Sequence, residues 1–107
     1  MVVSNHGGRQ LDAAPSTISV LPRMVDAVAQ RIPVFVDGGF RRGSDVVKAL
    51  AAGATAAFVG RPAAWGMATE GEAGARSVLA ALSEEIARTM ILIGTDRAAD
   101  ILSLIHI

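Results

Sequence analysis

The chain has 107 residues, 51% of them hydrophobic, and its ten basic and ten acidic residues give a formal net charge of zero at pH 7. This length allows at most one ordinary domain, and the balanced charge argues against a nucleic-acid partner, because nucleic-acid-binding surfaces are strongly basic. No apolar stretch reaches the roughly 18 residues of a membrane span. The lack of cysteine excludes disulfides and thiolate metal sites. Without a recognisable signal peptide, we expect a cytoplasmic enzyme, with peripheral association with the inner membrane as the alternative.

Three short apolar runs predict β-strands. We expect them near residues 1–4, 33–37 and 56–60, because each run is apolar at successive positions, which is typical of strands buried on both faces of a parallel sheet. A polar, glycine-rich segment follows each run. The carboxyl ends of parallel strands share one edge of a sheet, so these three segments should lie together.

Amphipathic segments between and after the strands predict helices. The first helix carries an apolar stripe and is expected to end at Pro33, and the second is expected to run from an N-cap at Ser44 to a stop at Gly53. After the third strand, a short helix over residues 62–65 should precede a longer one that ends at Gly94. The βαβαβα order predicts an α/β fold, and both a (β/α)8 barrel and an open doubly wound sheet fit it.

The segment 4–12, SNHGGRQLD, follows the first strand and places His6 and Arg9 three residues apart with two glycines between them. Imidazole titrates near neutrality and suits general-base work, whereas a guanidinium fork matches a carboxylate in bidentate geometry. The pair therefore predicts a base and a carboxylate clamp for one small molecule. An isolated His-x-x-Arg is more often a solvated loop, so the other motifs must decide between the two interpretations.

Two further turns predict an anion site. They comprise Asp37, Gly38, Gly39, Phe40 and Arg41 after the second strand, and Gly60 and Arg61 after the third. Free N–H groups at helix N-termini bind anions, and barrels often hold phosphate in the loops after their last two strands. The alternative is a pair of tight turns with solvated arginines, but two such turns in succession favour phosphate binding.

Taken together, these motifs resemble those of the FMN-dependent α-hydroxy acid dehydrogenases and oxidases, which include glycolate and lactate oxidases, L-lactate dehydrogenase and mandelate dehydrogenase. The resemblance covers residues 1 to about 101, and its first motif is highly specific. It implies that the fold is α/β, formed by the last three βα units of a (β/α)8 barrel. It also implies FMN as cofactor and oxidation of a small L-2-hydroxy acid to the 2-oxo acid.

The resemblance implies a role for each motif residue. His6 would be the catalytic base, Arg9 would bind the substrate carboxylate, and Ser4 would lie by the flavin. The residues implied to hold the FMN ribityl-phosphate are Asp37, Gly38, Gly39, Phe40, Arg41, Gly60 and Arg61. A tetramer-like homo-oligomer is expected, and oxygen, a quinone or a cytochrome could each be the electron acceptor.

The arginine-rich segment that follows Phe40 resembles the bacterial lactate and mandelate branch more than the plant oxidases. A bacterial origin is also indicated by the chain's basic residues, which are arginines except for Lys48. Because a complete barrel takes about 250 residues, we expect residues 1–101 to be the C-terminal portion of such an enzyme and to be inactive alone. Residues 102–107 match one reading frame of a transposase mosaic-end adapter, so we expect a non-native tail; an ordinary apolar terminus is the alternative.

Other interpretations stay open at this point. An FMN- or phosphate-binding barrel of different chemistry, such as a type 2 isopentenyl-diphosphate isomerase or an IMP dehydrogenase, would share the glycine–arginine turns but lack the His6 and Arg9 motif. An inactive structural fragment is the second alternative. Trp65 is expected to serve packing and Glu85 to be a helix-surface carboxylate, and two histidines without cysteine suggest no metal site.

Overall fold

A three-stranded parallel sheet forms the centre of the computed structural model, which describes residues 1–101; the expected tail over 102–107 lies outside them. The strands are β1 (Val2–Val3), β2 (Phe35–Val36) and β3 (Ala56–Ala57), in the order β1-β2-β3. Both pairings are parallel, as the sequence predicts, with Val36 opposite Val3 on one side and Ala57 on the other. The strands are shorter than expected, because regular pairing covers two residues in each.

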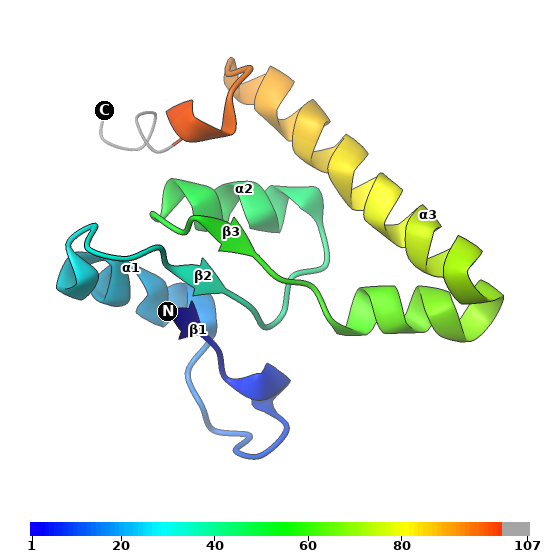
Figure 1. The fold of residues 1–107 in the computed structure, drawn as a ribbon, viewed down its shortest axis with the longest axis horizontal. Helices are drawn as coiled ribbons and strands as arrows, with labels where there is room; N and C mark the ends of the chain where they lie inside the picture. The colour runs from blue at the N-terminus through cyan, green and yellow to red at the C-terminus, as the bar shows by residue number, and fades with distance from the viewer. Residues whose placement is uncertain (102–107) are drawn as a thin grey trace.

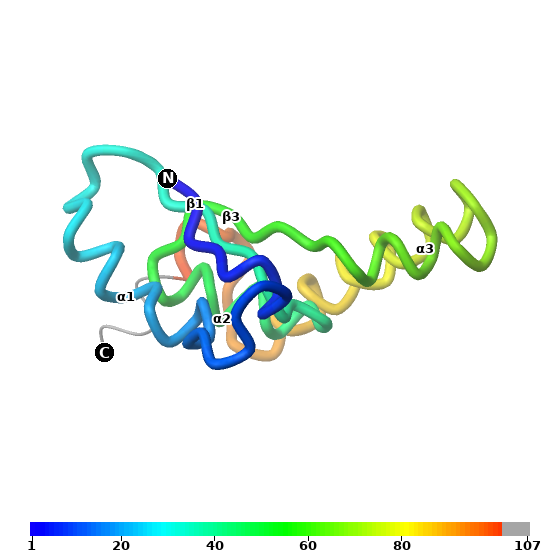
Figure 2. Tube along the Cα trace, turned by 90° about the horizontal axis from the view of Figure 1, so that it is seen from below, coloured from blue at the N-terminus to red at the C-terminus, as the bar shows by residue number. Residues whose placement is uncertain are grey.

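Helices connect the strands and continue the chain. They are α1 (Thr17–Val28), α2 (Gly43–Ala51) and α3 (Arg61–Ile93), with short 3-10 helices η1 (His6–Gly8) and η2 (Ala98–Asp100). Both α1 and α2 lie on the same side of the sheet, whereas α3 first runs away from the sheet and then returns along α2 (Figures 1 and 2). None of the helices within residues 1–101 is both long and apolar enough to cross a membrane.

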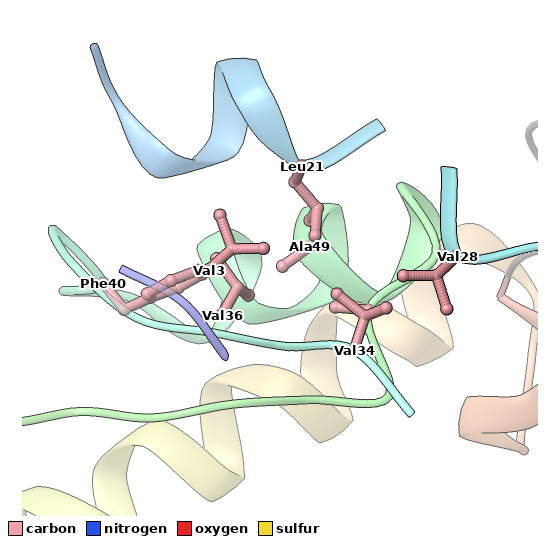
Figure 3. Close-up of a cluster of buried hydrophobic side chains, with 8 residues drawn as sticks. Val3, Leu21, Val28, Val34, Val36, Phe40 and Ala49 are labelled. Carbon is pink, nitrogen blue, oxygen red and sulfur yellow. The ribbon is translucent and has the colours of Figure 1, made fainter. Parts of the chain in front are cut away.

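The hydrophobic core lies between the sheet and these two helices (Figure 3). Leu21 of α1 and Val36 of β2 are fully buried. The buried cluster consists of Val3, Leu21, Val28, Val34, Val36, Phe40, Ala49 and Ala54. Complete burial of one large aliphatic side chain contributes about 1.5–3 kcal/mol, so this cluster fixes the strands against α1 and α2.

The first helix ends earlier than the sequence predicts. Residue Ala29 adopts the left-handed conformation (φ 48°) directly after Val28, so the expected end at Pro33 is wrong. Arg31 satisfies the last carbonyls of the shortened helix, because its amide and Nε donate to the Val28 carbonyl at 3.1 and 2.9 Å and its Nη2 donates to the Ala27 carbonyl at 2.9 Å. Ile32, the last member of the expected apolar stripe, is consequently exposed.

The second helix begins with different caps from those expected. Its N-cap is Arg42, and Ser44 already lies inside the helix, so the predicted cap is wrong. Asp45 accepts a hydrogen bond of 3.0 Å from the Arg42 amide, and Glu85 of α3 accepts one of 2.7 Å from the Gly43 amide. These carboxylates replace the serine hydroxyl, so Glu85 is a capping group rather than a free surface carboxylate.

The two helices expected after the third strand are the two arms of α3. The arms meet at a kink where Gly71 has φ 60° and ψ −138°, values that lie outside the helical region. A Cβ on Gly66 would lie 2.5 Å from the carbonyl oxygen of Gly74, so small residues allow the arms to touch. The helix stops at Gly94 in the left-handed conformation, which confirms the predicted end.

The returning arm of α3 packs on α2 through a second apolar cluster. Val47 and Ala51 of α2 are buried there with Ile101, and Ile86 and Met90 of α3 pack against them. The carboxyl-terminal end of the described chain therefore packs against α2, the helix that follows the second turn of the predicted site.

Gly43 provides a test of how closely α2 and α3 pack. A Cβ at this position would lie 2.5 Å from the Glu85 Cβ, and Gly43 is buried. We expect Gly43→Ala to lower the free energy of unfolding by about 1–3 kcal/mol, the usual cost of overpacking. Urea denaturation of the purified protein measures this change.

Ser44→Ala is the matched control one residue further along α2. Because the Ser44 hydroxyl makes no hydrogen bond within residues 1–101, its loss should change stability by less than about 0.5 kcal/mol. A loss of about 1 kcal/mol in the control would instead indicate that Ser44 caps the helix after all.

Candidate functional site

The turns that follow the three parallel strands leave the sheet at the same edge (Figure 1). Residues from all three turns line a cavity of about 300 Å³. The first turn contributes His6 and Gly7, the second contributes residues 37–41 and the third contributes residues 58–62. The juxtaposition predicted from the sequence is therefore confirmed. It places one imidazole, one carboxylate and two guanidinium groups around the same space.

Asn5 organises the first turn. Its Oδ1 accepts a hydrogen bond of 3.0 Å from the Gly7 amide, and its Nδ2 donates one of 3.2 Å to the carbonyl of Pro15. A Cβ on Gly38 would lie 2.8 Å from the same Oδ1, so the second turn can approach Asn5 only with glycine at that position. Sequence reasoning missed Asn5, although its hydrogen bond two residues ahead is the usual Asx-turn pattern.

His6 adopts a left-handed backbone conformation, with φ 54°. Such a conformation in a non-glycine residue costs on the order of 1–3 kcal/mol and is concentrated at functional sites. The Ser4 Oγ accepts a hydrogen bond of 3.1 Å from the His6 amide and thereby supports the turn. As a result, the exposed imidazole lies at the rim of the cavity.

The other two site residues predicted in this segment lie outside the cavity lining. Ser4 acts on the backbone of the turn, as described above, and Arg9 is exposed at the end of η1. The Arg9 amide donates a hydrogen bond of 3.3 Å to the His6 carbonyl. Both candidate catalytic side chains therefore extend from a single turn, although only the imidazole lines the cavity.

Thr17, the first residue of α1, anchors the second turn. Its Oγ1 donates a hydrogen bond of 2.6 Å to the Asp37 carbonyl, and it is the one buried polar residue among residues 1–101. The following Gly38 and Gly39 have φ values of 92° and 85°, which only glycine adopts readily. Thr17 escaped the sequence analysis because its partner lies 20 residues away.

The side chain of Asp37 carries an unmet hydrogen-bonding requirement. Its Oδ1 is buried and finds no donor within the part of the chain that the structure describes. A buried, unpaired carboxylate oxygen is costly, so it marks a place where a donor from a bound molecule would be favourable. Because Asp37 lines the cavity, a ligand hydroxyl could supply that donor.

Within the described chain, the backbone amides that remain unbonded in the second turn lie at the glycines and not at the start of α2. The amides of Arg41 and Arg42 both donate to Asp45 Oδ2, and the Gly43 amide donates to Glu85. These donors are thus already satisfied by the protein's own carboxylates. The amides of Gly39 and Phe40 have no acceptor among the described residues and are free for a ligand. The Phe40 side chain packs in the core, so only its backbone can contribute.

Two guanidinium groups supply positive charge to the cavity. The Arg61 Nη2 donates a hydrogen bond of 3.3 Å to the Gly7 carbonyl, and the Arg41 guanidinium lies over the ring of Trp65. Within residues 1–101, neither arginine forms an ion pair. Positive charge that no internal carboxylate neutralises suits the binding of an anion.

Comparison with known proteins identifies clear relatives. A family model described as FMN-dependent dehydrogenase matches residues 1–106. Glycolate oxidase 1 of Oryza sativa subsp. indica is 56% identical over 101 residues, which is 94% of this chain and 27% of the rice protein. 2-Hydroxyacid oxidase 1 of Homo sapiens is 56% identical over 94 residues, 88% of this chain and 25% of the human protein. The chain thus spans about a quarter of the length of these curated relatives.

Solved structures give the same picture. A mandelate oxidase crystallised with (S)-2-phenylpropionate superimposes with a TM-score of 0.91 at 48% identity, over 94% of this chain and 30% of that one. A Pediococcus acidilactici protein described as a lactate oxidase superimposes with a TM-score of 0.92 at 44% identity, over 95% of this chain and 28% of that one. These similarities confirm the predicted fold class, α/β, corresponding to the C-terminal part of a (β/α)8 barrel. The lean toward the bacterial lactate and mandelate branch stays a prediction, since glycolate oxidases match equally clearly.

Thr17 provides a test of what holds the second turn. Thr17→Val preserves the shape of the side chain but removes the hydroxyl, which leaves the part-buried Asp37 carbonyl without this donor. We expect the free energy of unfolding to fall by about 1–3 kcal/mol. Thr17→Ser keeps the hydroxyl and loses one methyl group, so it should cost about 0.8 kcal/mol.

Urea denaturation gives both values, and hydrogen exchange at the Asp37 amide, which donates a hydrogen bond to the Val3 carbonyl, reports the start of the turn directly. The valine variant should accelerate exchange there, while the serine variant should not. Equal stability of the valine variant and the wild-type protein would mean that the hydroxyl does not secure the turn.

Proposed function

Since the chain belongs to the FMN-dependent dehydrogenase family, we propose that its cavity is part of the active site of an enzyme that oxidises a small L-2-hydroxy acid to the 2-oxo acid. The observation that carries the proposal is the convergence of His6, the unpaired Asp37 oxygen and two unneutralised arginines on one cavity. The names of the relatives, oxidases of glycolate, mandelate and 2-hydroxy acids, support this substrate class. The activity is proposed for the whole protein. We expect the present chain to be inactive on its own.

FMN, the cofactor of this family, has an anionic phosphate and a ribityl chain with hydroxyl donors. These groups complement the unpaired arginines, free amides and unpaired carboxylate oxygen of the cavity. Arg41 and Arg61 would bind the phosphate together with the Gly39 and Phe40 amides. The buried Oδ1 of Asp37 would accept a hydrogen bond from a ribityl hydroxyl, which satisfies its missing donor. Glycines 38, 39 and 60 would let the ligand approach the backbone closely. When bound, FMN accepts the two electrons of the oxidation.

His6 would remove a proton from the substrate. Its position at the rim of the cavity gives it access to a molecule bound over the cofactor site, and an imidazole is suited to this transfer near neutral pH. The positive φ of His6 and the hydrogen bond from its amide to the Ser4 hydroxyl fix the direction in which the side chain leaves the backbone. Ser4 would itself lie near the flavin.

Arg9 would bind the substrate carboxylate through its planar guanidinium. Because Arg9 and His6 belong to one hydrogen-bonded turn, clamping the carboxylate also sets the distance between the substrate and the base. Arg9 is exposed in the structure, so its side chain is free to turn toward a bound acid.

Replacement of the base tests the proposal most directly. In the complete enzyme, His6→Gln should slow reduction of the flavin by substrate by about 10²–10⁴, the usual contribution of a general base. Affinity for the substrate should change little, because Arg9 still holds the carboxylate. Anaerobic stopped-flow measurement of flavin bleaching follows this step.

Arg9→Lys is the contrasting variant. It keeps the charge but loses the bidentate fork, so both substrate affinity and rate should fall. A near-normal rate of flavin reduction in His6→Gln would contradict the base assignment. The rival interpretation, a phosphate-binding barrel of different chemistry, would be favoured instead if 2-hydroxy acids failed to reduce the flavin of the unmodified complete enzyme.

Removal of one arginine tests the assignment of the phosphate. Arg61→Ala should lower the affinity for FMN by about 1.5–3 kcal/mol, the value of a charge-assisted hydrogen bond, with a smaller effect on substrate binding. Equilibrium dialysis of the apoprotein against FMN measures it. Arg88→Ala, an exposed arginine of α3 outside the cavity, is the control and should leave the affinity unchanged. Unchanged FMN binding combined with a raised KM for Arg61→Ala would assign this arginine to the substrate instead.

A further inference from the structure

The aromatic ring of Trp65 supports the guanidinium of Arg41. The Arg41 Cζ lies 4.7 Å from the ring centroid, inside the range of about 6 Å over which a cation is attracted to an aromatic face. Trp65 is half-exposed and does not belong to either hydrophobic cluster. The sequence-based expectation that this residue serves packing therefore does not describe its contact.

The position of Trp65 on α3 ties this contact to the cavity. Trp65 follows Arg61 by four residues, so both lie on the same face of the first arm of the helix. Arg61 lines the cavity itself, and Arg41 reaches the same cavity from the second turn. The ring thus lies beside the place where the two guanidinium groups converge.

The Arg41 guanidinium is held by the Trp65 ring and forms no ion pair within residues 1–101. Asp45, four residues after it in sequence, accepts hydrogen bonds from the Arg41 and Arg42 amides instead. The ion pairs found within residues 1–101 involve Arg42, Arg76 and Arg97 but not Arg41. A carboxylate partner would compete with an anionic ligand for the guanidinium, whereas the face of an aromatic ring leaves the full charge available.

We infer that Trp65 is a positioning residue that holds the Arg41 guanidinium ready for the phosphate of the cofactor. Free arginine side chains lose rotamer entropy when they bind, and a ring that restricts the side chain beforehand lowers this cost. Arg61 is arranged in the same manner, since its partner is the uncharged carbonyl of Gly7. Uncharged partners thus orient both arginines. The inference rests on the proposed assignment of Arg41 to the phosphate.

The consequence is selectivity for a phosphorylated flavin. Riboflavin shares the ring and the ribityl chain of FMN but lacks the phosphate, so its binding should not depend on Arg41 or Trp65. The ratio of FMN affinity to riboflavin affinity isolates the proposed role, because general damage to the fold would lower both affinities together.

The test is titration of the apoprotein of the complete enzyme with FMN and with riboflavin, followed by flavin fluorescence. Trp65→Leu should lower the FMN-to-riboflavin ratio about two- to fivefold, the range expected for an exposed cation–π contact. Trp65→Phe retains an aromatic face and should restore most of the ratio. Trp65→Gln is a second variant without a ring, suited to a half-exposed position, for use if the leucine variant does not fold.

Arg41→Ala serves as the reference variant, because it tests the assignment of Arg41 to the phosphate separately from the role of Trp65. We expect it to lower the ratio by at least tenfold, and Trp65→Leu should have no further effect in that background. An unchanged ratio in Arg41→Ala would overturn the assignment of Arg41 itself. A lowered ratio there, with an unchanged ratio in Trp65→Leu and Trp65→Gln, would overturn the role of Trp65 alone. Equal loss of both flavins in the Trp65 variants would also overturn it, since the residue would then be structural.

Discussion

The central strand β2 is bonded to both of the other strands, and the candidate site depends on this pairing. Val36 is fully buried, lies opposite Val3 and Ala57, and is followed at once by Asp37. Because both neighbours run parallel to β2, the turns after all three strands must emerge at the same edge. His6, Asp37 and Arg61, which are far apart in sequence, are brought together by this constraint and by the core that fixes the sheet to α1 and α2.

A division of roles follows among the polar groups around the cavity. One set, which includes Asn5, Thr17 and Glu85, satisfies the backbone of the turns and the start of α2. A second set keeps its binding capacity: the buried oxygen of Asp37 has no donor within the described residues, and the site arginines have no carboxylate partner there. Structural carboxylates therefore do not compete with the ligand for the cations. This separation lets a rigid scaffold present an electrostatically unsatisfied site.

The same arrangement supports His6, the one non-glycine residue in the described cavity lining that has a positive φ. His6 has a positive φ, and both of its backbone polar groups are hydrogen-bonded within the turn: its amide donates to the Ser4 hydroxyl, and its carbonyl accepts from the Arg9 amide. Those bonds and the close approach of Gly38 to Asn5 hold a conformation that His6 alone would rarely adopt. Asp37 Oδ1, the one buried side-chain oxygen without a hydrogen-bond partner among residues 1–101, lies in the cavity at this edge.

The sequence alone determined the order of the elements, the parallel sheet and the turns that carry chemistry, because apolar periodicity and glycine-rich breaks are local signals. It also predicted that His6, Asp37, Arg41 and Arg61 would lie together, since their residue types are unusual directly after a buried strand, and all four line the cavity. The end of the first helix and the start of the second were mispredicted at Pro33 and Ser44, because Arg31 caps the first helix and the carboxylates of Asp45 and the distant Glu85 cap the second.

Only the tertiary structure decided which amides and charges stay free for a ligand. Glu85 lies 42 residues from the amide that it caps, and Thr17 lies 20 residues from the carbonyl that it satisfies. Trp65 approaches Arg41 only because β2 and β3 pair side by side. Such contacts join segments that are distant along the chain, and the local pattern of residues carries no record of which distant group will satisfy a donor or orient a charge.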